Sequence, residues 1–180
     1  MTPTVSARDR VLDAFETLLI EHGERGATLD ATAALAGVSK GGLLYHFGNR
    51  GALIEGLLER LSARAEADAH LMASAPAGSI DYLLRTSVYT GEDFDRTMIA
   101  VTRLAQSEDS RAGVALAAVR RTWLDLIQQQ VQDPAVAETI MLVSDGLYMN
   151  STLDCSTPAE AHTLSSTSID EVLAVVARLY

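Results

Sequence analysis

The chain has 180 residues, 48% of them hydrophobic, and a formal net charge of −10 at pH 7. This length and hydrophobic content predict a folded globular protein of one or two domains and exclude intrinsic disorder. The negative charge excludes a protein that coats nucleic acid through bulk electrostatics, because non-specific binding depends on Lys and Arg neutralising phosphates. The single cysteine, Cys155, excludes an internal disulfide framework. It indicates a reducing compartment, so we expect a cytoplasmic protein.

Neither a secretion signal nor a membrane span is expected. The N-terminal sequence MTPTVSARDRVLDAF lacks the basic start, apolar core and cleavage site of a signal peptide. No apolar run approaches the roughly 18 residues that cross a bilayer. We therefore expect no membrane partner.

The first 73 residues predict three short helices and one long helix. Apolar side chains recur at helical spacing in the first and the last of these segments. Gly23 supplies a C-terminal cap for the first helix, and Thr28, Ser39 and Asn49 are N-caps for the others. The predicted helices are 10–22, 29–35, Ser39 to about His46, and 49–73.

The sequence SAPAGS at residues 74–79 marks the next boundary, because small residues, Pro and Gly interrupt the helical pattern. Beyond it no segment shows the alternation of a strand, and the expected helices are 79–90, 92–107, 110–132, 134–153 and 168–180. A polar loop is expected at 154–167. The fold class is therefore all-α, with about nine helices.

Residues 28–43 carry the spacing of a helix-turn-helix. Ala33 is small enough for two helices to cross closely, and Gly37 can take the positive φ of the turn. Val38 and Leu43 fill the angle between the helices. In such a unit the second helix lies in the major groove, with its N-terminal residues against base edges.

Gly41 and Gly42 are adjacent inside this second helix, although each costs about 1 kcal/mol relative to alanine. Glycine has no side chain to hold DNA away, so Lys40 and Tyr45 can reach the duplex. Lys40 is the sole lysine of the chain, and no acidic residue occurs between Asp30 and Glu55. A carboxylate in this window would face phosphate, so its absence fits a surface that touches DNA.

Residues 10–54 resemble the DNA-binding domain of the TetR family of transcriptional regulators. The matching pieces are Arg10-Val11-Leu12, Ala14, Phe15, Gly23, Thr28, Ala33, the run AGVSKGGL, His46-Phe47 and Leu53. The resemblance implies a DNA-binding domain at residues 1–50, a connecting helix at 49–73, and a helical ligand-binding and dimerisation domain at 51–180. The DNA-binding residues that follow are Thr28, Ser39, Lys40, Gly41, Gly42, Tyr45, His46 and Arg50.

The sequence departs from the family pattern at two of these positions. The family's tyrosine is replaced by Leu44, and Tyr45 follows one step later, which on a helix is a rotation of about 100°. The family's lysine at the start of the fourth helix is Arg50 here. Arginine keeps the charge and can bind phosphate through two nitrogens.

The C-terminal part is expected to hold a small apolar or aromatic effector and to dimerise. Rings and thioethers adapt to irregular hydrophobic ligands, and Asp145 within an apolar helix needs a partner such as Arg103 or Arg120. The resemblance implies a homodimer through the helices 134–153 and 168–180, which binds a palindromic operator in double-stranded DNA and is released by the effector. The candidate effector-binding residues are Tyr89, Met98, Thr102, Trp123, Met141, Asp145 and Tyr148.

Other functions find less support in the sequence. The order Ser-Lys-Gly-Gly does not fit a Walker-type phosphate loop, and the four histidines stand in no catalytic context, so no catalytic residue and no cofactor are expected. Asp154, Cys155, Glu160 and His162 share one loop but lack the paired spacing of a zinc site, so no metal is expected.

A small-residue helix packed inside a bundle is a further interpretation of residues 39–50. The remaining alternative is an all-helical binding or adaptor protein that keeps the fold without sequence-specific DNA binding.

Overall fold

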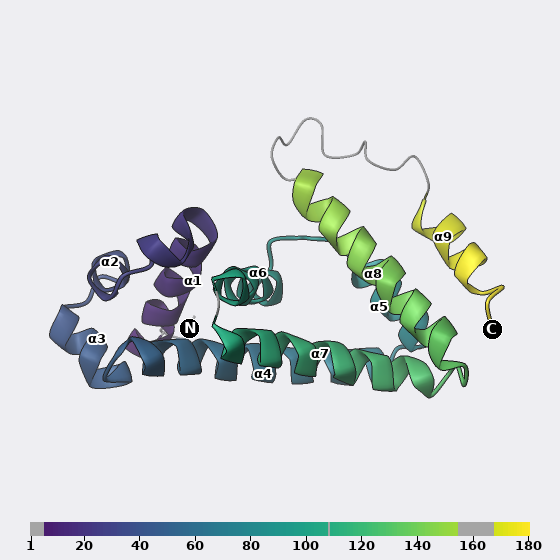
Figure 1. Ribbon diagram of the computed structural model, residues 1–180, viewed down its shortest axis with the longest axis horizontal. Coiled ribbons are helices and arrows are strands. Elements are labelled where there is room, and N and C mark those ends of the chain that lie inside the picture. The colour runs from purple at the N-terminus through teal and green to yellow at the C-terminus, as the bar shows by residue number, and fades with distance from the viewer. Residues whose placement is uncertain (1–5, 108, 155–167) are drawn as a thin grey trace, which may run out of the picture. The chain divides into compact units, whose positions relative to one another are not determined.

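The computed structural model describes residues 6–107, 109–154 and 168–180, and within these ranges it contains helices and no strand (Figure 1). The all-α prediction is confirmed. The described helices are α1 (Ala7–Gly26), α2 (Leu29–Leu35), α3 (Lys40–Phe47), α4 (Arg50–Ala73), α5 (Ser79–Thr86), α6 (Asp93–Gln106), α7 (Ser110–Gln128), α8 (Pro134–Asp154) and α9 (Ile169–Val176).

Three helices end earlier than the sequence pattern predicts. For α5 the prediction extends to residue 90, but the helix ends at Thr86. The Ser87 hydroxyl donates to the Leu83 carbonyl at 2.6 Å, and Ser87 leaves the helical conformation with ψ 50°. Such side-chain bonds compete with the helical ladder. The predictions for α7 and α9 likewise extend about four residues too far, to 132 and 180.

The helices pack into two compact units. The first contains the chain up to Ala65 together with Gly91–Ala118, and the second contains Glu66–Thr90 together with Val119–Tyr180. The boundaries therefore fall inside α4 and α7, each of which supplies residues to both units. The functional boundary that the sequence places near residue 50 stays a prediction.

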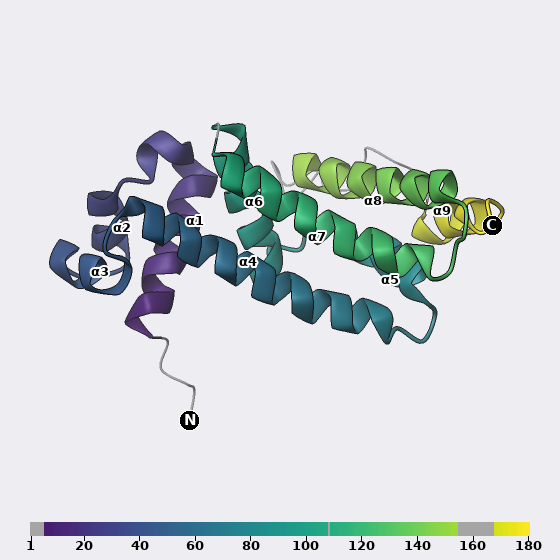
Figure 2. The same cartoon turned by 60° about the horizontal axis from the view of Figure 1, so that its bottom comes forward.

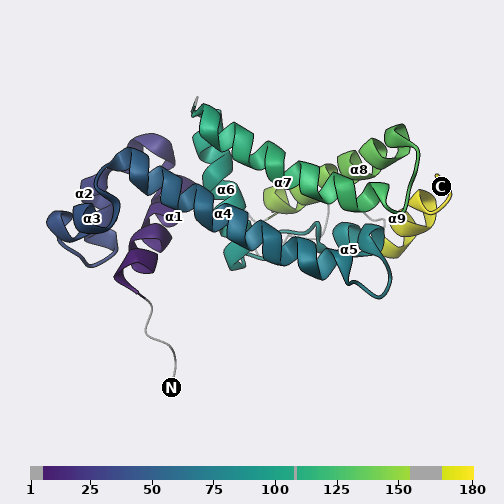
Figure 3. The same ribbon diagram turned by 90° about the horizontal axis from the view of Figure 1, so that it is seen from below.

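The first unit is built on α1. One face of this helix is buried, and Leu12, Phe15 and Leu19 are fully shielded from solvent. Leu43 of α3 and Leu57 of α4 are fully buried in the same unit. Each such side chain contributes about 2 kcal/mol through the hydrophobic effect. Although α6 follows α1 by more than sixty residues, it lies beside α1 (Figures 1 and 3).

A buried carboxylate joins three helices of this unit. Glu16 of α1 is only 2% exposed, and its Oε1 accepts from Arg60 and Arg64 of α4 at 3.3 and 3.4 Å. The hydroxyl of Thr97, on α6, donates to the same oxygen at 2.7 Å. Arg64 also donates to the Thr97 hydroxyl and to the Asp93 carbonyl. A buried charge is tolerated only when it is paired and hydrogen-bonded in this way.

Arg60 extends the network towards the start of α1. It forms ion pairs with Asp9 at 3.2 Å and with Asp13 at 2.6 Å. The hydrogen bond from Ser6, together with the bond and charge of Arg60, holds the pKa of Asp9 below its ordinary value. The Asp9 carboxylate therefore stabilises the fold at neutral pH and loses this contribution as the pH falls through its lowered pKa.

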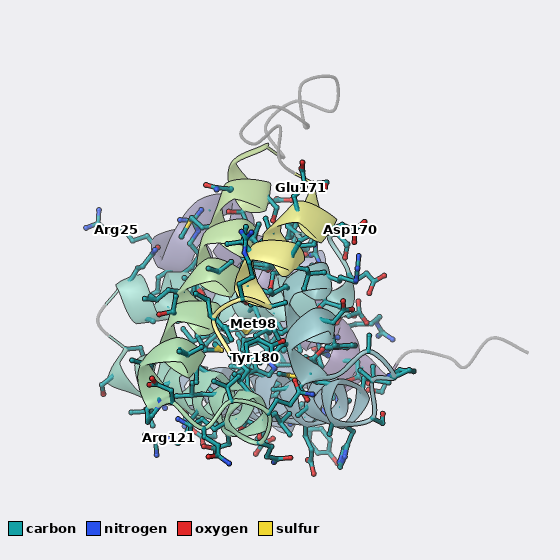
Figure 4. All side chains as sticks on the ribbon, turned by 90° about the vertical axis from the view of Figure 1, so that its right-hand side faces the viewer. Arg25, Met98, Arg121, Asp170, Glu171 and Tyr180 are labelled. Atoms are coloured by element: carbon teal, nitrogen blue, oxygen red, sulfur yellow. The ribbon has the colours of Figure 1, made fainter. Side chains whose placement is uncertain are left out.

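The second unit has its own core, formed by α5, α8, α9 and the parts of α4 and α7 that belong to it. Met72, Leu84, Ile127 and Ile140 are fully buried there. Figures 2 and 3 show α9, in yellow, next to α5. Arg85 of α5 bonds Asp170 of α9 at 2.7 Å, and Asp170 is labelled in Figure 4.

None of the helices described is long and apolar enough to cross a membrane. Among the described residues there is also no group of three His, Cys, Asp or Glu side chains that could hold a metal ion. The loop with Cys155, Glu160 and His162 lies outside those residues, as does the side chain of Asp154.

Replacing Glu16 with alanine is expected to lower the free energy of unfolding by about 2–4 kcal/mol, because two partly buried arginines lose a shared acceptor. Chemical denaturation followed by circular dichroism measures this change. Glu59→Ala is the matched control, since Glu59 makes an exposed pair with Arg8 at 3.0 Å. We expect the control to cost less than about 1 kcal/mol. Equal losses in the two variants would contradict the role of Glu16.

Candidate nucleic-acid interface

Local hydrogen bonds shape the helix-turn-helix as the sequence predicts. The Thr28 hydroxyl accepts from the Ala31 amide at 3.1 Å and starts α2, and the Ser39 hydroxyl accepts from the Gly42 amide at 3.0 Å and starts α3. In the turn, Gly37 has φ 66°, which a side chain would strain. The Val38 amide donates to the Ala33 carbonyl at 3.0 Å. These bonds fix the angle at which α3 leaves α2.

One face of α3 holds it to the unit and the other is open. Leu43 and Phe47 are buried on the inner face. Lys40, Tyr45 and His46 are exposed, and Tyr45 is 87% exposed. The rings of Tyr45 and His46 meet edge to face, with centroids 5.3 Å apart. An exposed tyrosine beside a histidine and a lysine suits contacts to phosphates and base edges.

The shifted tyrosine is therefore on the solvent side of α3. Leu44 stands where the family has tyrosine, and it is half-buried, whereas Tyr45 points outward. The one-residue shift removes a ring from the half-buried position and places it on the exposed face. Its contact with DNA stays a prediction.

The two glycines of α3 differ in how much space surrounds them. A Cβ atom at Gly41 would meet only the Ser39 hydroxyl, at an ordinary contact distance of 3.9 Å. At Gly42 the same hydroxyl would be 3.3 Å away, which is tight. Nothing inside the unit therefore requires glycine at position 41. Close approach of DNA as the reason for this glycine stays a prediction.

Arg50 has partners inside the unit. Its guanidinium donates to the carbonyls of Ala27 and Glu24 and to the Glu24 carboxylate, the last at 3.4 Å. It also lies over the ring of Phe15, 5.7 Å from the centroid. These contacts fasten the first residue of α4 to the end of α1. Sequence reasoning missed this internal role, because Glu24 and Arg50 are 26 residues apart.

Lys40 also has a partner that the sequence pattern did not reveal. Its ammonium lies 3.0 Å from the carboxylate of Asp30, on α2. Both side chains are exposed. Thr28 and Ser39, two further predicted contacts, use their hydroxyls as helix caps.

Another cation of this unit is exposed without such a partner. Arg25 lies in the last turn of α1, and its side chain points away from its helix (Figure 4). Within the described ranges it makes no ion pair. It was not among the predicted contacts, because Arg25 precedes the helix-turn-helix in the sequence.

The predicted effector-binding residues are divided between the two units. Met98 and Thr102 lie on α6 in the first unit. In the second, Met141 is fully buried in the core and Trp123 packs against it. The Tyr89 amide donates to the Ser151 hydroxyl at 2.7 Å, and this hydroxyl donates to the Tyr148 carbonyl, so Tyr89 and Tyr148 are brought together.

Trp123 is fixed by a carboxylate that the sequence analysis did not single out. Its indole N–H donates to Asp68 at 2.8 Å, and the Tyr82 hydroxyl donates to the other oxygen of Asp68 at 2.9 Å. Burial, followed by the bond to Asp68, raises the pKa of Tyr82 to about 12. The hydroxyl of Tyr82 therefore keeps the proton that it donates to Asp68 even at alkaline pH, where an ordinary tyrosine begins to lose it.

Asp145 differs from the expectation of a buried acid. It is exposed on α8. Its carboxylate pairs with Arg120 at 3.2 Å, and Arg120 also bonds Glu138. Of the two partners named from the sequence, Arg120 is the one used.

The outer face of α3, the second or reading helix of the helix-turn-helix, is exposed, and a larger all-helical part follows it. This arrangement is typical of DNA-binding transcriptional regulators. The sequence model described as "Bacterial regulatory proteins, tetR family" matches residues 11–57. The model described as "Tetracyclin repressor-like, C-terminal domain" matches residues 80–165. The chain belongs to the TetR family of transcriptional regulators.

Solved structures show the same fold at low sequence identity. A TetR-family regulator from Rhodococcus sp. is 20% identical with a TM-score of 0.65, over 96% of this chain and 95% of that chain. NalD, the secondary repressor of the MexAB-OprM multidrug efflux pump in Pseudomonas aeruginosa, is 20% identical with a TM-score of 0.67, over 96% and 94%. The multidrug binding protein EbrR, complexed with malachite green, is 23% identical with a TM-score of 0.66, over 96% of each chain. A search of curated proteins gave no match.

Replacing Gly41 with alanine is expected to stabilise the protein by about 0.5–1 kcal/mol and to weaken DNA binding. Alanine is the better helix former, and the site has space for its methyl group, whereas DNA loses its close approach. Thermal unfolding and fluorescence anisotropy with labelled duplex DNA measure the two effects. Gly113→Ala is the control, because Gly113 also has open space but lies on α7. Unchanged DNA affinity in Gly41→Ala would contradict the outward role of Gly41.

Proposed function

We propose that this chain is a ligand-responsive repressor of the TetR family, which binds a palindromic operator as a homodimer and is released by a small apolar or aromatic effector. It acts in the cytoplasm, where its DNA target lies. The observation that carries the proposal is the outer face of α3, where Lys40, Gly41 and Tyr45 are exposed together.

Helix geometry supports the reading of DNA by α3. The N-terminus of the second helix in a helix-turn-helix points into the major groove. Lys40 is the first residue of α3, and Gly41 and Gly42 follow in its first turn. Lysine can bind phosphate or the acceptors of guanine, and the glycines bring the backbone close. Tyr45 and His46, one turn later, extend the contact along the helix.

Exposed apolar side chains support a homodimer through α8 and α9. Extended exposed apolar surface often marks a site where a partner binds. Gly146 on α8 has open space where a Cβ atom would lie, which permits another helix to approach closely. Two copies would carry two reading helices, separated by roughly 34 Å or a multiple on a palindromic site. The exposed apolar residues of this part are Leu142, Met149, Val175, Leu179 and Tyr180, the last labelled in Figure 4.

The nature of the effector follows from the second unit and from the relatives. Trp123 and Tyr82 are half-buried rings packed against the apolar core of this unit, and Tyr148 on α8 is half-buried as well. EbrR is a multidrug binding protein described in complex with malachite green and with ethidium, both aromatic dyes. An aromatic effector stacks favourably on such rings. These two facts support an aromatic molecule.

A physical link from effector to DNA runs through Glu16. The Thr97 hydroxyl and the Asp93 carbonyl join α6 to this network, and Arg60 and Arg64 join α4 to it. A shift of α6 or α4 breaks charged hydrogen bonds around a buried carboxylate unless α1 follows. An effector acts by binding one arrangement of these helices more tightly than the other. Release of DNA is the expected result.

Replacing Lys40 with alanine is expected to weaken binding to operator DNA roughly tenfold and to flatten its salt dependence by about 0.9 in the log–log slope, because one phosphate contact is lost. Fluorescence anisotropy at several salt concentrations, with duplexes from the DNA upstream of the chain's own gene, measures both quantities. Arg121→Ala is the control, since Arg121 is an exposed cation on α7 in the second unit (Figure 4).

If wild-type protein and the Lys40→Ala variant bind with the same affinity and the same slope, α3 does not read DNA through Lys40. If the wild type binds none of these duplexes, the alternative of a helical adaptor protein without sequence-specific DNA binding is favoured instead.

Binding of an aromatic effector is expected to quench the fluorescence of Trp123, the only tryptophan of the chain. Titration with malachite green should give a saturable signal. Trp123→Phe should weaken binding about 5- to 10-fold in calorimetry, because the larger ring and its N–H bond to Asp68 are lost. Quenching that rises linearly without saturation would show that the dye does not bind a defined site.

A further inference from the structure

The ion pair between Lys40 and Asp30 joins the two helices of the DNA-reading motif. Asp30 is in the first turn of α2, and Lys40 is the first residue of α3. The ammonium and the carboxylate are 3.0 Å apart, while the side chains are 54% and 71% exposed. Asp30 is also the last acid before the window that contains α3 and the start of α4. This carboxylate, at the edge of the acid-free window, is therefore engaged by the first residue of α3.

The position of Lys40 is unfavourable for α3 itself. A helix dipole places partial positive charge at the N-terminus, so a cation there is disfavoured. The first turn of α3 contains no acidic residue that would offset it. Asp30 supplies the missing negative charge from the neighbouring helix. Its carboxylate is in turn favoured where it lies, near the N-terminus of α2.

DNA competes with Asp30 for the same ammonium. A phosphate that approaches Lys40 must displace the carboxylate or share the ammonium with it, and both outcomes reduce the electrostatic gain. The pair is exposed, so its own free energy is small and DNA can break it. Pairing of Lys40 with Asp30 therefore lowers the affinity of the protein for any DNA duplex.

We propose that Asp30 sets the DNA affinity of this protein by holding Lys40, which keeps sequence-independent binding to phosphates weak. The inference rests on the proposed DNA-binding function and adds a residue that limits it. Lys40 binds phosphate either by releasing Asp30 or by sharing its ammonium with it. Discrimination between DNA sequences then depends on contacts with base edges rather than on attraction to phosphate.

The test is Asp30→Asn, which keeps the shape of the side chain and removes its charge. Affinity for a random-sequence duplex at low salt should rise roughly two- to fivefold, as expected for release of an exposed ion pair. The log–log salt slope should become steeper, by at most about 0.9, because Lys40 then delivers more of its charge to phosphate. Fluorescence anisotropy measures both. Asp30→Ser, with the same readouts, serves if the asparagine variant does not fold.

Glu21→Gln is the matched control, because it removes the same charge from an exposed position on α1. Its affinity should stay close to that of the wild type. An equal gain in Glu21→Gln and Asp30→Asn would show an effect of net charge and would overturn the proposal.

A double-mutant cycle with Lys40→Ala tests whether Asp30 acts by pairing with Lys40 or by repelling phosphate directly. The gain from Asp30→Asn should shrink when Lys40 is absent. A gain of the same size or larger in that background would mean that Asp30 acts by repelling phosphate directly, which would overturn the proposal.

If wild-type protein binds DNA but Asp30→Asn leaves affinity and slope unchanged, this inference alone fails. If neither protein binds any duplex, the proposed function itself fails.

Discussion

The buried carboxylate of Glu16 constrains three helices of the first unit at once. Among the described residues it is the one ionised side chain that is buried. Because an unpaired charge in that position is costly, Arg60, Arg64 and Thr97 must all stay within hydrogen-bond distance of it. Three helices that are distant in sequence therefore share one acceptor. The contacts of α1 with α2 and α3 then carry this fixed arrangement to the reading helix.

An acidic chain that binds a polyanion must restrict where its positive charge is available. The structure does so by pairing the cations of the reading region with carboxylates. Arg50 pairs with Glu24 at the junction between α1 and α4, and Lys40 pairs with Asp30. The other exposed residues of α3 are Gly41, Tyr45 and His46, which offer mainly shape to a partner. Recognition by close fit is less dependent on salt than recognition by charge, and it suits a protein that must ignore most of the DNA around it.

The sequence predicted the parts of the fold that depend on neighbours along the chain. The caps Thr28 and Ser39, the turn at Gly37 and the burial of Leu43 follow from short-range spacing, and the structure confirms them. Pairings between distant residues were missed, among them Arg50 with Glu24 and Trp123 with Asp68, because nothing in the local pattern encodes them. The exposure of Asp145 was missed for a related reason. A helix that is apolar on more than one face does not reveal which side of it meets solvent.

The presence of a single lysine at the head of α3 has a chemical consequence. Reagents that are selective for amines have one side-chain target in the chain, and this target lies at the proposed contact with DNA. A fluorophore or cross-linker attached through an amine therefore reports on the reading helix, with the α-amino group of the chain as its competitor. Acetylation of the same nitrogen would remove the charge for which Asp30 and phosphate compete. A chemical modification of lysine in this protein is therefore a modification of α3.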